Sequence, residues 1–201
     1  VIECHVSYTS PPGFRPMSEV EDVWDSMSER VVDMITFSLR DTKNAKVFVE
    51  AKTAIHTFIR TLESFEFSVS RLNALVLSFF RRFAQLLRER FAADFQQAIR
   101  EAQHQPMIVN DATELAKVLS VCWLKPGEAE QLAKQPFPLS LPFSQTYPLC
   151  CMDIRSLVEQ YYSFSQGMTQ YHQEIDAILS QSLDDLLIQL ISVNIRDTVE
   201  Q

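Results

Sequence analysis

The chain has 201 residues, of which 46% are hydrophobic and 22% are charged, and its formal net charge is −8. This composition is typical of a soluble globular protein, which at this length buries about two thirds or more of its unfolded surface. Because contacts with phosphates require an excess of Lys and Arg, the negative charge argues against a nucleic-acid-binding protein.

The ends and the cysteines indicate where the protein is found. The chain starts at Val1, without an initiator methionine or a leader sequence, so we expect it to be a piece of a longer protein. Its longest apolar run, residues 74–80, is far shorter than the ~20 residues that a membrane span needs. The four cysteines lack the spacing of a disulfide framework, and we expect free thiols in a cytosolic protein. They are Cys4, Cys122, Cys150 and Cys151.

The N-terminal part of the chain predicts an irregular segment over residues 1–17 and then two helices, over 18–40 and 47–62. In both helices apolar residues recur at spacings of three and four, which is the period of a helix with one buried face. Only a short polar break, 41–44, separates the two helices. So short a connection favours an antiparallel pair.

A third helix is predicted over residues 70–99, where apolar residues form one continuous stripe. At ~1.5 Å per residue this helix is a rod of ~45 Å. A connector follows over 104–110. Asp111 and Glu114 then have the spacing of a capping box, which predicts a short fourth helix.

A proline-rich segment follows, "KQPFPLSLPFSQTYPLC", which contains four of the nine prolines of the chain. Since proline removes a backbone donor and pushes the preceding residue toward an extended conformation, residues 134–143 predict an extended strap. Its apolar residues alternate, so we expect Phe137, Leu141 and Phe143, together with Leu139, to pack on one side against helices. The alternative is a PxxP-type ligand for a partner domain.

Beyond the strap, the pattern predicts a helix that begins at Ser144 or Tyr147, a break near Gly167 and a last helix over 175–195. No segment of comparable length alternates like a strand. We therefore expect an all-α fold of elongated, stacked antiparallel helical bundles, without a sheet and with the proline-rich strap. The expected parts are an irregular segment 1–17, a first bundle 18–121, a connector 122–146 and a second bundle 147–201 that is incomplete at its C-terminus.

The residues that carry chemistry do not form a recognisable site. Three glycines leave no phosphate-binding loop. The four histidines have no metal-ligand spacing, and Cys4 with His5 is the nearest candidate for a metal site. No local signature marks a nucleophile. Asp184 and Asp185 are adjacent, but their side chains diverge by ~100° on a helix, which favours a solvated face over an acid pair. We expect no catalytic residue, no cofactor and no metal, and hence not an enzyme.

Charge is distributed unevenly along the chain. Residues 71–100 carry six arginines and two acids, whereas residues 172–201 carry one arginine and six acids. Four arginines decorate the third helix around its apolar stripe and are candidates for a partner surface. The alternative is a peripheral membrane-binding module that recognises anionic lipid through them. They are Arg81, Arg82, Arg88 and Arg90.

Several stretches resemble one known family. They include "LLRERFAADFQQAI", "PMIVNDATELAKVLSVCWL" and, as the most specific part, "QPFPLSLPFSQTYPLCCMDIRSLVEQYYSFS". They are similar to the exocyst subunit family named after the fifteenth SEC locus, in its fungal form, from about residue 20 to the end. The resemblance implies a helical rod of the CATCHR type without enzyme activity, a scaffold that tethers secretory vesicles to the plasma membrane before SNARE-mediated fusion.

The same resemblance implies the partners and the location. The partners are other exocyst subunits, bound through helix-helix packing. In the full-length protein a Rab GTPase is bound as well, at a site that we expect outside this chain, so no Rab-contact residue is assigned. The vesicle and the plasma membrane are contacted indirectly. The expected location is cytoplasmic, peripheral at secretory vesicles and at sites of polarised exocytosis.

Overall fold

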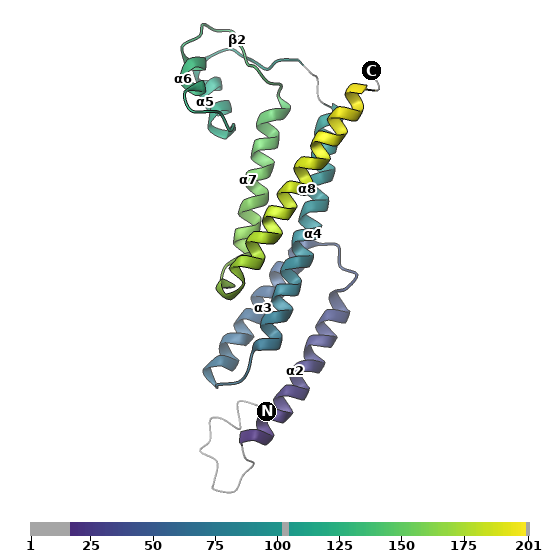
Figure 1. The fold of residues 1–201 in the computed structure, drawn as a ribbon. Helices are drawn as coiled ribbons and strands as arrows, with labels where there is room; N and C mark the ends of the chain where they lie inside the picture. Colours follow the sequence, from purple (N-terminus) through teal and green to yellow (C-terminus); the bar gives the residue numbers. More distant parts are fainter. Residues whose placement is uncertain (1–16, 102–104, 200–201) are drawn as a thin grey trace. The chain divides into compact units, whose positions relative to one another are not determined.

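A computed structural model describes residues 17–101 and 105–199 of the chain (Figure 1). These residues form two compact units, which are divided between Leu86 and Leu87, inside a helix. The expected connector, 122–146, lies within the second unit. The division therefore differs from the expected one, which placed a bundle on each side of the proline-rich segment.

The described residues are mostly helical, so the prediction of an all-α fold is confirmed. Five helices in this part of the chain have 20 or more residues, and they follow the chain order that the apolar spacing predicts. Shorter elements lie between them. The elements are α2 (Met17–Leu39), α3 (Ala45–Ser64), α4 (Ser70–Glu101), β1 (Ile108–Val109), α5 (Ala112–Val121), α6 (Glu128–Ala133), β2 (Leu139–Ser140), α7 (Thr146–Ser165), a 3-10 turn (Thr169–Tyr171) and α8 (His172–Val199).

The first unit consists of α2, α3 and residues 70–86 of α4. Asn44 caps α3, because its side chain accepts a hydrogen bond from the backbone N–H of Lys46 at 3.0 Å. Phe48 of α3 meets Phe79 of α4 edge to face, with ring centroids 5.5 Å apart. The buried side of α3 has the spacing of one helical face. Its residues are Phe48, Ile55, Ile59 and Leu62.

The second unit contains residues 87–101 of α4 and the two long helices α7 and α8, which run antiparallel (Figure 1). The expected break near Gly167 is confirmed: α7 ends at Ser165, and Gly167 adopts a φ of 82°, a left-handed conformation that favours glycine. Each helix buries one apolar face. The buried residues are Leu87, Phe91 and Phe95 of α4, Leu157, Tyr161 and Phe164 of α7, and Ile175, Leu179 and Leu186 of α8.

The second unit also contains a small lobe of α5, α6 and the proline-rich segment. Here the structure corrects the expectation that the chain has no sheet: β1 and β2 form a two-stranded antiparallel ladder with Val109 opposite Leu139. Prolines prevent this segment from satisfying its backbone groups in a helix, and the connector beside it supplies the partners. Both strands have two residues, too few for an alternating pattern to announce them.

None of the helices in the described ranges has the length and the hydropathy required to cross a membrane.

Candidate partner-binding surfaces

The N-terminal half of α2 is fixed to the first unit around Trp24. The indole N–H of Trp24 donates a hydrogen bond of 2.7 Å to the carbonyl oxygen of Ser68, and its ring contacts Phe58 and Phe67 at centroid distances of 6.2 and 5.8 Å. Arg71, in the first turn of α4, donates to Ser28 Oγ at 3.1 Å. These contacts hold one side of α2 against the start of α4.

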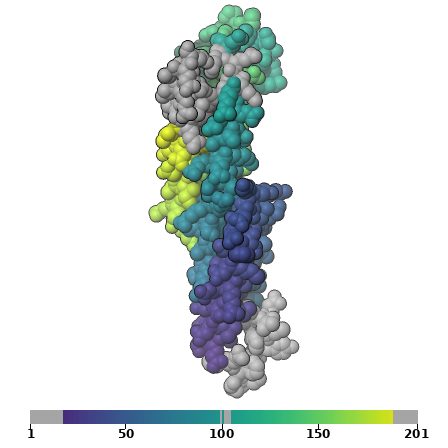
Figure 2. Space-filling view, turned by 90° about the vertical axis from the view of Figure 1, so that its right-hand side faces the viewer, coloured from purple at the N-terminus to yellow at the C-terminus, as the bar shows by residue number. Residues whose placement is uncertain are grey.

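The side of α2 next to the packed one exposes apolar side chains. Met34 and Phe37 leave 64% and 67% of their surface in solvent, and Val23 and Met27 leave 47% and 44%. In the space-filling view of Figure 2, the purple surface of α2 faces the viewer. We call Val23, Met27, Met34 and Phe37 the α2 stripe. It presents an apolar surface along a helix, which is the type of surface that other helices bind.

The apolar spacing in the sequence predicts α2 only as a helix with one buried face. Residues at spacings of three and four include Val23, Met27 and Met34, and periodicity alone cannot separate the buried positions from the exposed ones. A signal was available: at ~100° per residue the apolar residues of α2, from Phe37 around to Val32, cover more than half of the helix circumference.

The four arginines of the third predicted helix lie on α4, but the structure distributes them over both units. In the first unit Arg81 is exposed, and Arg82 donates to Gln85 Oε1 at 2.9 Å. In the second unit Arg90 donates to Gln160 Oε1 at 3.3 Å, and its guanidinium lies 4.8 Å from the ring centre of Phe91.

Arg88 is paired inside the second unit. It forms a short salt bridge with Asp185 of α8, and Gln181 donates a hydrogen bond of 2.8 Å to the other oxygen of Asp185. Asp184 is exposed, whereas Asp185 is only 30% exposed because it pairs with Arg88. Sequence reasoning could not find this pair, because its members are 97 residues apart.

The strap residues differ in their surroundings. Leu139 and Leu141 are buried, and Phe143 is half-buried with its ring 5.0 Å from that of Tyr147. Phe137 is 37% exposed, which corrects the expectation that it anchors the strap. The reason is local: the chain bends at residues 137 and 138, so the alternation of an extended segment begins only at β2.

Backbone hydrogen bonds tie the strap to the connector that precedes α5. The N–H of Met107 donates to the carbonyl of Phe143 at 2.9 Å, and the N–H of Leu141 donates to the carbonyl of Met107 at 2.8 Å. The strap thus covers a core of its own, which the sequence did not predict. The core residues are Val109, Leu115, Val118, Cys122, Leu132, Leu139 and Leu141.

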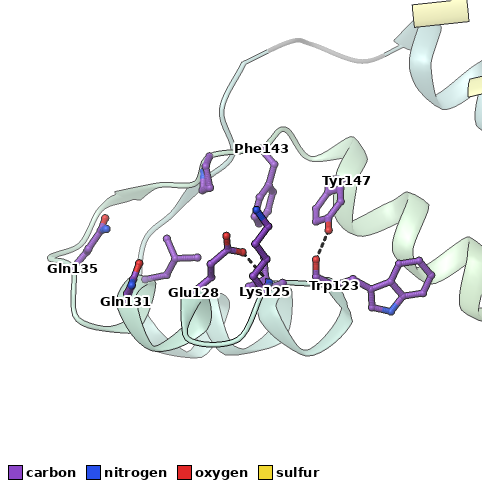
Figure 3. Close-up of a pocket in the computed structure, with 10 residues that line it drawn as sticks. Trp123, Lys125, Glu128, Gln131, Gln135, Phe143 and Tyr147 are labelled. Atoms are coloured by element: carbon purple, nitrogen blue, oxygen red, sulfur yellow. Dashed lines mark hydrogen bonds between the residues drawn. The ribbon is translucent and has the colours of Figure 1, made fainter. Parts of the chain in front are cut away.

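A pocket of about 430 Å³ lies between α6, the strap and the start of α7 (Figure 3). Its lining combines apolar side chains, among them Leu132 and Phe143, with polar ones. Glu128 accepts a hydrogen bond of 3.0 Å from the backbone N–H of Lys125, and the hydroxyl of Tyr147 donates to the carbonyl of Trp123 at 2.5 Å. The lining residues are Trp123, Leu124, Lys125, Glu128, Gln131, Leu132, Gln135, Pro142, Phe143 and Tyr147. The pocket is suited to an apolar side chain, and it contains no nucleophile paired with a base.

Among the thiols of the described residues, those of Cys122 and Cys151 are buried and that of Cys150 is half-buried. Cys122, Cys150 and Cys151 are free, and Cys4, a candidate metal ligand with His5, lies outside the described residues. Burial is the main cause that raises the pKa of Cys122 and of Cys150 above the ordinary value of a thiol. Within the described ranges no three His, Cys, Asp or Glu side chains form a group that could hold a metal.

Comparison with known proteins identifies the family. The sequence model of the family described as exocyst complex subunit Sec15 C-terminal matches residues 71–201. The exocyst complex component SEC15 of Saccharomyces cerevisiae is 24% identical over 189 residues, which are 91% of this chain and 21% of the yeast protein. The exocyst complex component sec15 of Schizosaccharomyces pombe is 28% identical over 153 residues, 76% of this chain and 19% of that protein.

The similarity extends to animals. The exocyst complex component 6 of Rattus norvegicus is 24% identical over 192 residues, which are 96% of this chain and 23% of the rat protein. The chain thus spans about a fifth of the length of the curated relatives that it matches. No solved structure matches it. Since the family match covers well over half of the chain, the chain belongs to the Sec15 C-terminal family of exocyst complex subunits.

Proposed function

We propose that this chain is a non-enzymatic scaffold segment of an exocyst subunit, and that the whole subunit tethers secretory vesicles to the plasma membrane before SNARE-mediated fusion. The observation that carries the proposal is the family match over residues 71–201. The apolar surface of α2 and the pocket beside α6 support it, because both are suited to protein partners and neither holds a catalytic arrangement. The subunit acts in the cytoplasm, at the surface of vesicles and at sites of polarised exocytosis.

The partners in this proposal are other exocyst subunits, which bind through helix-helix contacts. The full-length protein additionally acts as a Rab GTPase effector, with the Rab site outside residues 1–201. The mechanism requires no chemistry from the chain. It requires rigid helices that present apolar residues at fixed spacings, with charged residues beside them that select the partner.

The experiment compares the chain with the full-length subunit in pull-downs. Each is mixed with the purified members of the complex and with Rab loaded with GTP or GDP. We expect the chain to retain at least one exocyst member, and only the full-length protein to retain Rab, with a preference for GTP. Failure of both proteins to bind any exocyst member would contradict the scaffold proposal, and GTP-dependent capture of Rab by the chain would move the Rab site into residues 1–201.

Direct recognition of anionic lipid is the second candidate, and the exposure of Arg81 is the observation that favours it. The salt bridge of Arg88 with Asp185 weakens it, because that charge already has a partner. Flotation with phosphoinositide vesicles at physiological and at high salt distinguishes the candidates. Recovery that is lost at high salt and in the double variant Arg81→Glu, Arg82→Glu would favour lipid binding over scaffolding.

A further inference from the structure

We propose that the α2 stripe is the docking surface for an amphipathic helix of a partner protein, with apolar residues at heptad spacing and basic residues along one edge. The inference rests on the proposed function, and it goes further by naming the surface and the chemistry of its partner. Three features of α2 lead to it: uncovered apolar residues, their spacing, and the charge beside them.

The C-terminal half of α2 is less buried than the N-terminal half, since Met34 and Phe37 are exposed and its other apolar residues are only half-buried. Of the residues 29–39 none is buried, although six of them are apolar. They are Val31, Val32, Met34, Ile35, Phe37 and Leu39. Most of the stability of a helix in a protein comes from packing of its apolar face. An additional contact on this half of α2 removes the exposed apolar surface and stabilises the helix.

The spacing of the stripe indicates a helical partner. A heptad repeat places Val23 and Phe37 at d positions and Met27 and Met34 at a positions. The d position between the two methionines is Arg30. At ~1.5 Å per residue the stripe is about 21 Å long. A second helix packed side by side meets such residues along its whole length. Extended peptides instead bind at the free edge of a sheet or in an aromatic-lined groove.

The charge of α2 selects the partner. The helix carries six acidic residues and one arginine. At ~100° per residue, three carboxylates lie beside the Phe37 edge of the stripe, those of Asp22, Glu29 and Asp33. The other edge of the stripe adjoins the side of α2 that packs through Trp24. A partner helix therefore places its basic edge next to these carboxylates. A second copy of α2 would oppose acids with acids, and an anionic membrane would be repelled.

The test uses the 201-residue chain and a synthetic amphipathic helix with leucine at the seam and lysine at the flanking positions. A second peptide has glutamate in place of each lysine. We expect the lysine peptide to bind in a fluorescence-anisotropy titration and the glutamate peptide to bind at least about tenfold more weakly. Met34→Asp and Phe37→Asp should each weaken binding of the lysine peptide at least about tenfold.

Ile188→Asp is the matched control, because Ile188 lies on α8 and is 65% exposed, as Met34 is at 64%. It should leave binding unchanged. All three side chains are already in water, so the melting temperatures should remain those of the unmodified chain. Equal binding to the unmodified chain and to Met34→Asp, or no binding of the lysine peptide, would overturn the proposal. So would stripe-dependent dimerisation in sedimentation, or stripe-dependent recovery with anionic vesicles.

Two outcomes separate the docking surface from the scaffold role. If the chain retains exocyst subunits while Met34→Asp has no effect on either those subunits or the peptide, only the docking surface is wrong. If the peptide binds through the stripe but no exocyst subunit binds the chain, the surface is right and the scaffold role is wrong.

Discussion

At the scale of single residues, the strap shows how strongly neighbouring apolar positions can differ. Leu141 is 1% exposed in the core of the small lobe, whereas Phe137 is 37% exposed. Leu141→Ala should therefore lower the free energy of unfolding by about 3 kcal/mol, through lost burial and the cavity left behind. Phe137→Ala should cost less than about 1 kcal/mol. Urea denaturation of the two variants measures both values.

Phe137→Ala is the matched control for Leu141→Ala, since both substitutions remove an apolar side chain from the same segment. A larger loss for Phe137→Ala than for Leu141→Ala would mean that Phe137 anchors the strap after all. A negligible loss for both would mean that the strap contributes nothing to stability.

A second prediction concerns the hydrogen bond between α7 and α8. The hydroxyl of Tyr161 donates to Ser182 Oγ at 2.7 Å, and both residues are buried. Tyr161→Phe leaves the buried hydroxyl of Ser182 without this partner, and we expect a loss of about 1–2 kcal/mol. Thermal unfolding of the variant in parallel with the unmodified chain measures the loss.

The double variant Tyr161→Phe, Ser182→Ala removes both polar groups and is the control. Because replacement of both partners by apolar groups costs less than leaving one of them unpaired, its loss should be smaller than the sum of the two single losses. Additive losses would indicate that the two hydroxyls do not depend on each other.

At the scale of elements, α5 is determined by its first residues. The side chain of Asp111 accepts hydrogen bonds from the N–H groups of Thr113 and Glu114, both at 2.8 Å, and Glu114 reaches back to the N–H of Asn110 at 2.8 Å. The capping pattern in the sequence is therefore confirmed. Asp111→Ala should cost about 1 kcal/mol of stability, measured by circular dichroism on heating.

Asp111→Asn retains an acceptor at the same place and is the control for the cap. Its stability should stay within a few tenths of a kcal/mol of the unmodified chain. Equal losses for the Ala and Asn variants would show that the charge beside the helix dipole matters more than the hydrogen bonds.

The opposite charges of α4 and α8 also belong to this scale. Arg88 and Asp185 satisfy each other, but both side chains keep about a third of their surface in solvent, 34% and 30%. Solvent screening makes the stabilisation by such a pair small. Its main effect is to remove one arginine from the surface that the charge distribution had indicated for a partner or for lipid.

At the scale of the whole molecule, thiols and phenols with raised pKa values are expected to make stability depend on pH. Burial is the first cause that raises the pKa values of Cys122, Cys150, Tyr147 and Tyr161. Because these pKa values are raised, the folded state keeps its protons up to a higher pH than the unfolded state does. For the thiols, the resulting contribution to the free energy of unfolding is fully present below the pKa of an unfolded thiol, about 8.5. It is lost as the pH rises through the pKa values of the folded state. We expect the melting temperature to fall progressively above about pH 8.

The double variant Cys122→Ala, Cys150→Ala isolates the thiols. Its stability at pH 7 will be lower because side-chain volume is lost, but its slope between about pH 8 and 10 should be shallower than that of the unmodified chain. An identical slope would assign the pH dependence to the tyrosines or to other groups.

The sequence by itself determined the helices. Apolar spacing located α2, α3, α4, α7 and α8, the pair Asp111 and Glu114 located the start of α5, and Gly167 located the break before the 3-10 turn. These features depend on residues within one or two helical turns of each other, so they can be read along the chain. The family resemblance was also carried by local stretches, and the match over residues 71–201 confirms it.

Only the tertiary structure decided which apolar residues are buried and which charged residues are paired. It paired Arg88 with Asp185, joined β1 to β2, exposed Phe137 and left the α2 stripe uncovered. Each of these outcomes depends on residues that are distant in the sequence, or on the absence of a neighbour over one face of a helix. Periodicity shows that a helix has an apolar side, but the arrangement of the other elements determines how much of that side is buried.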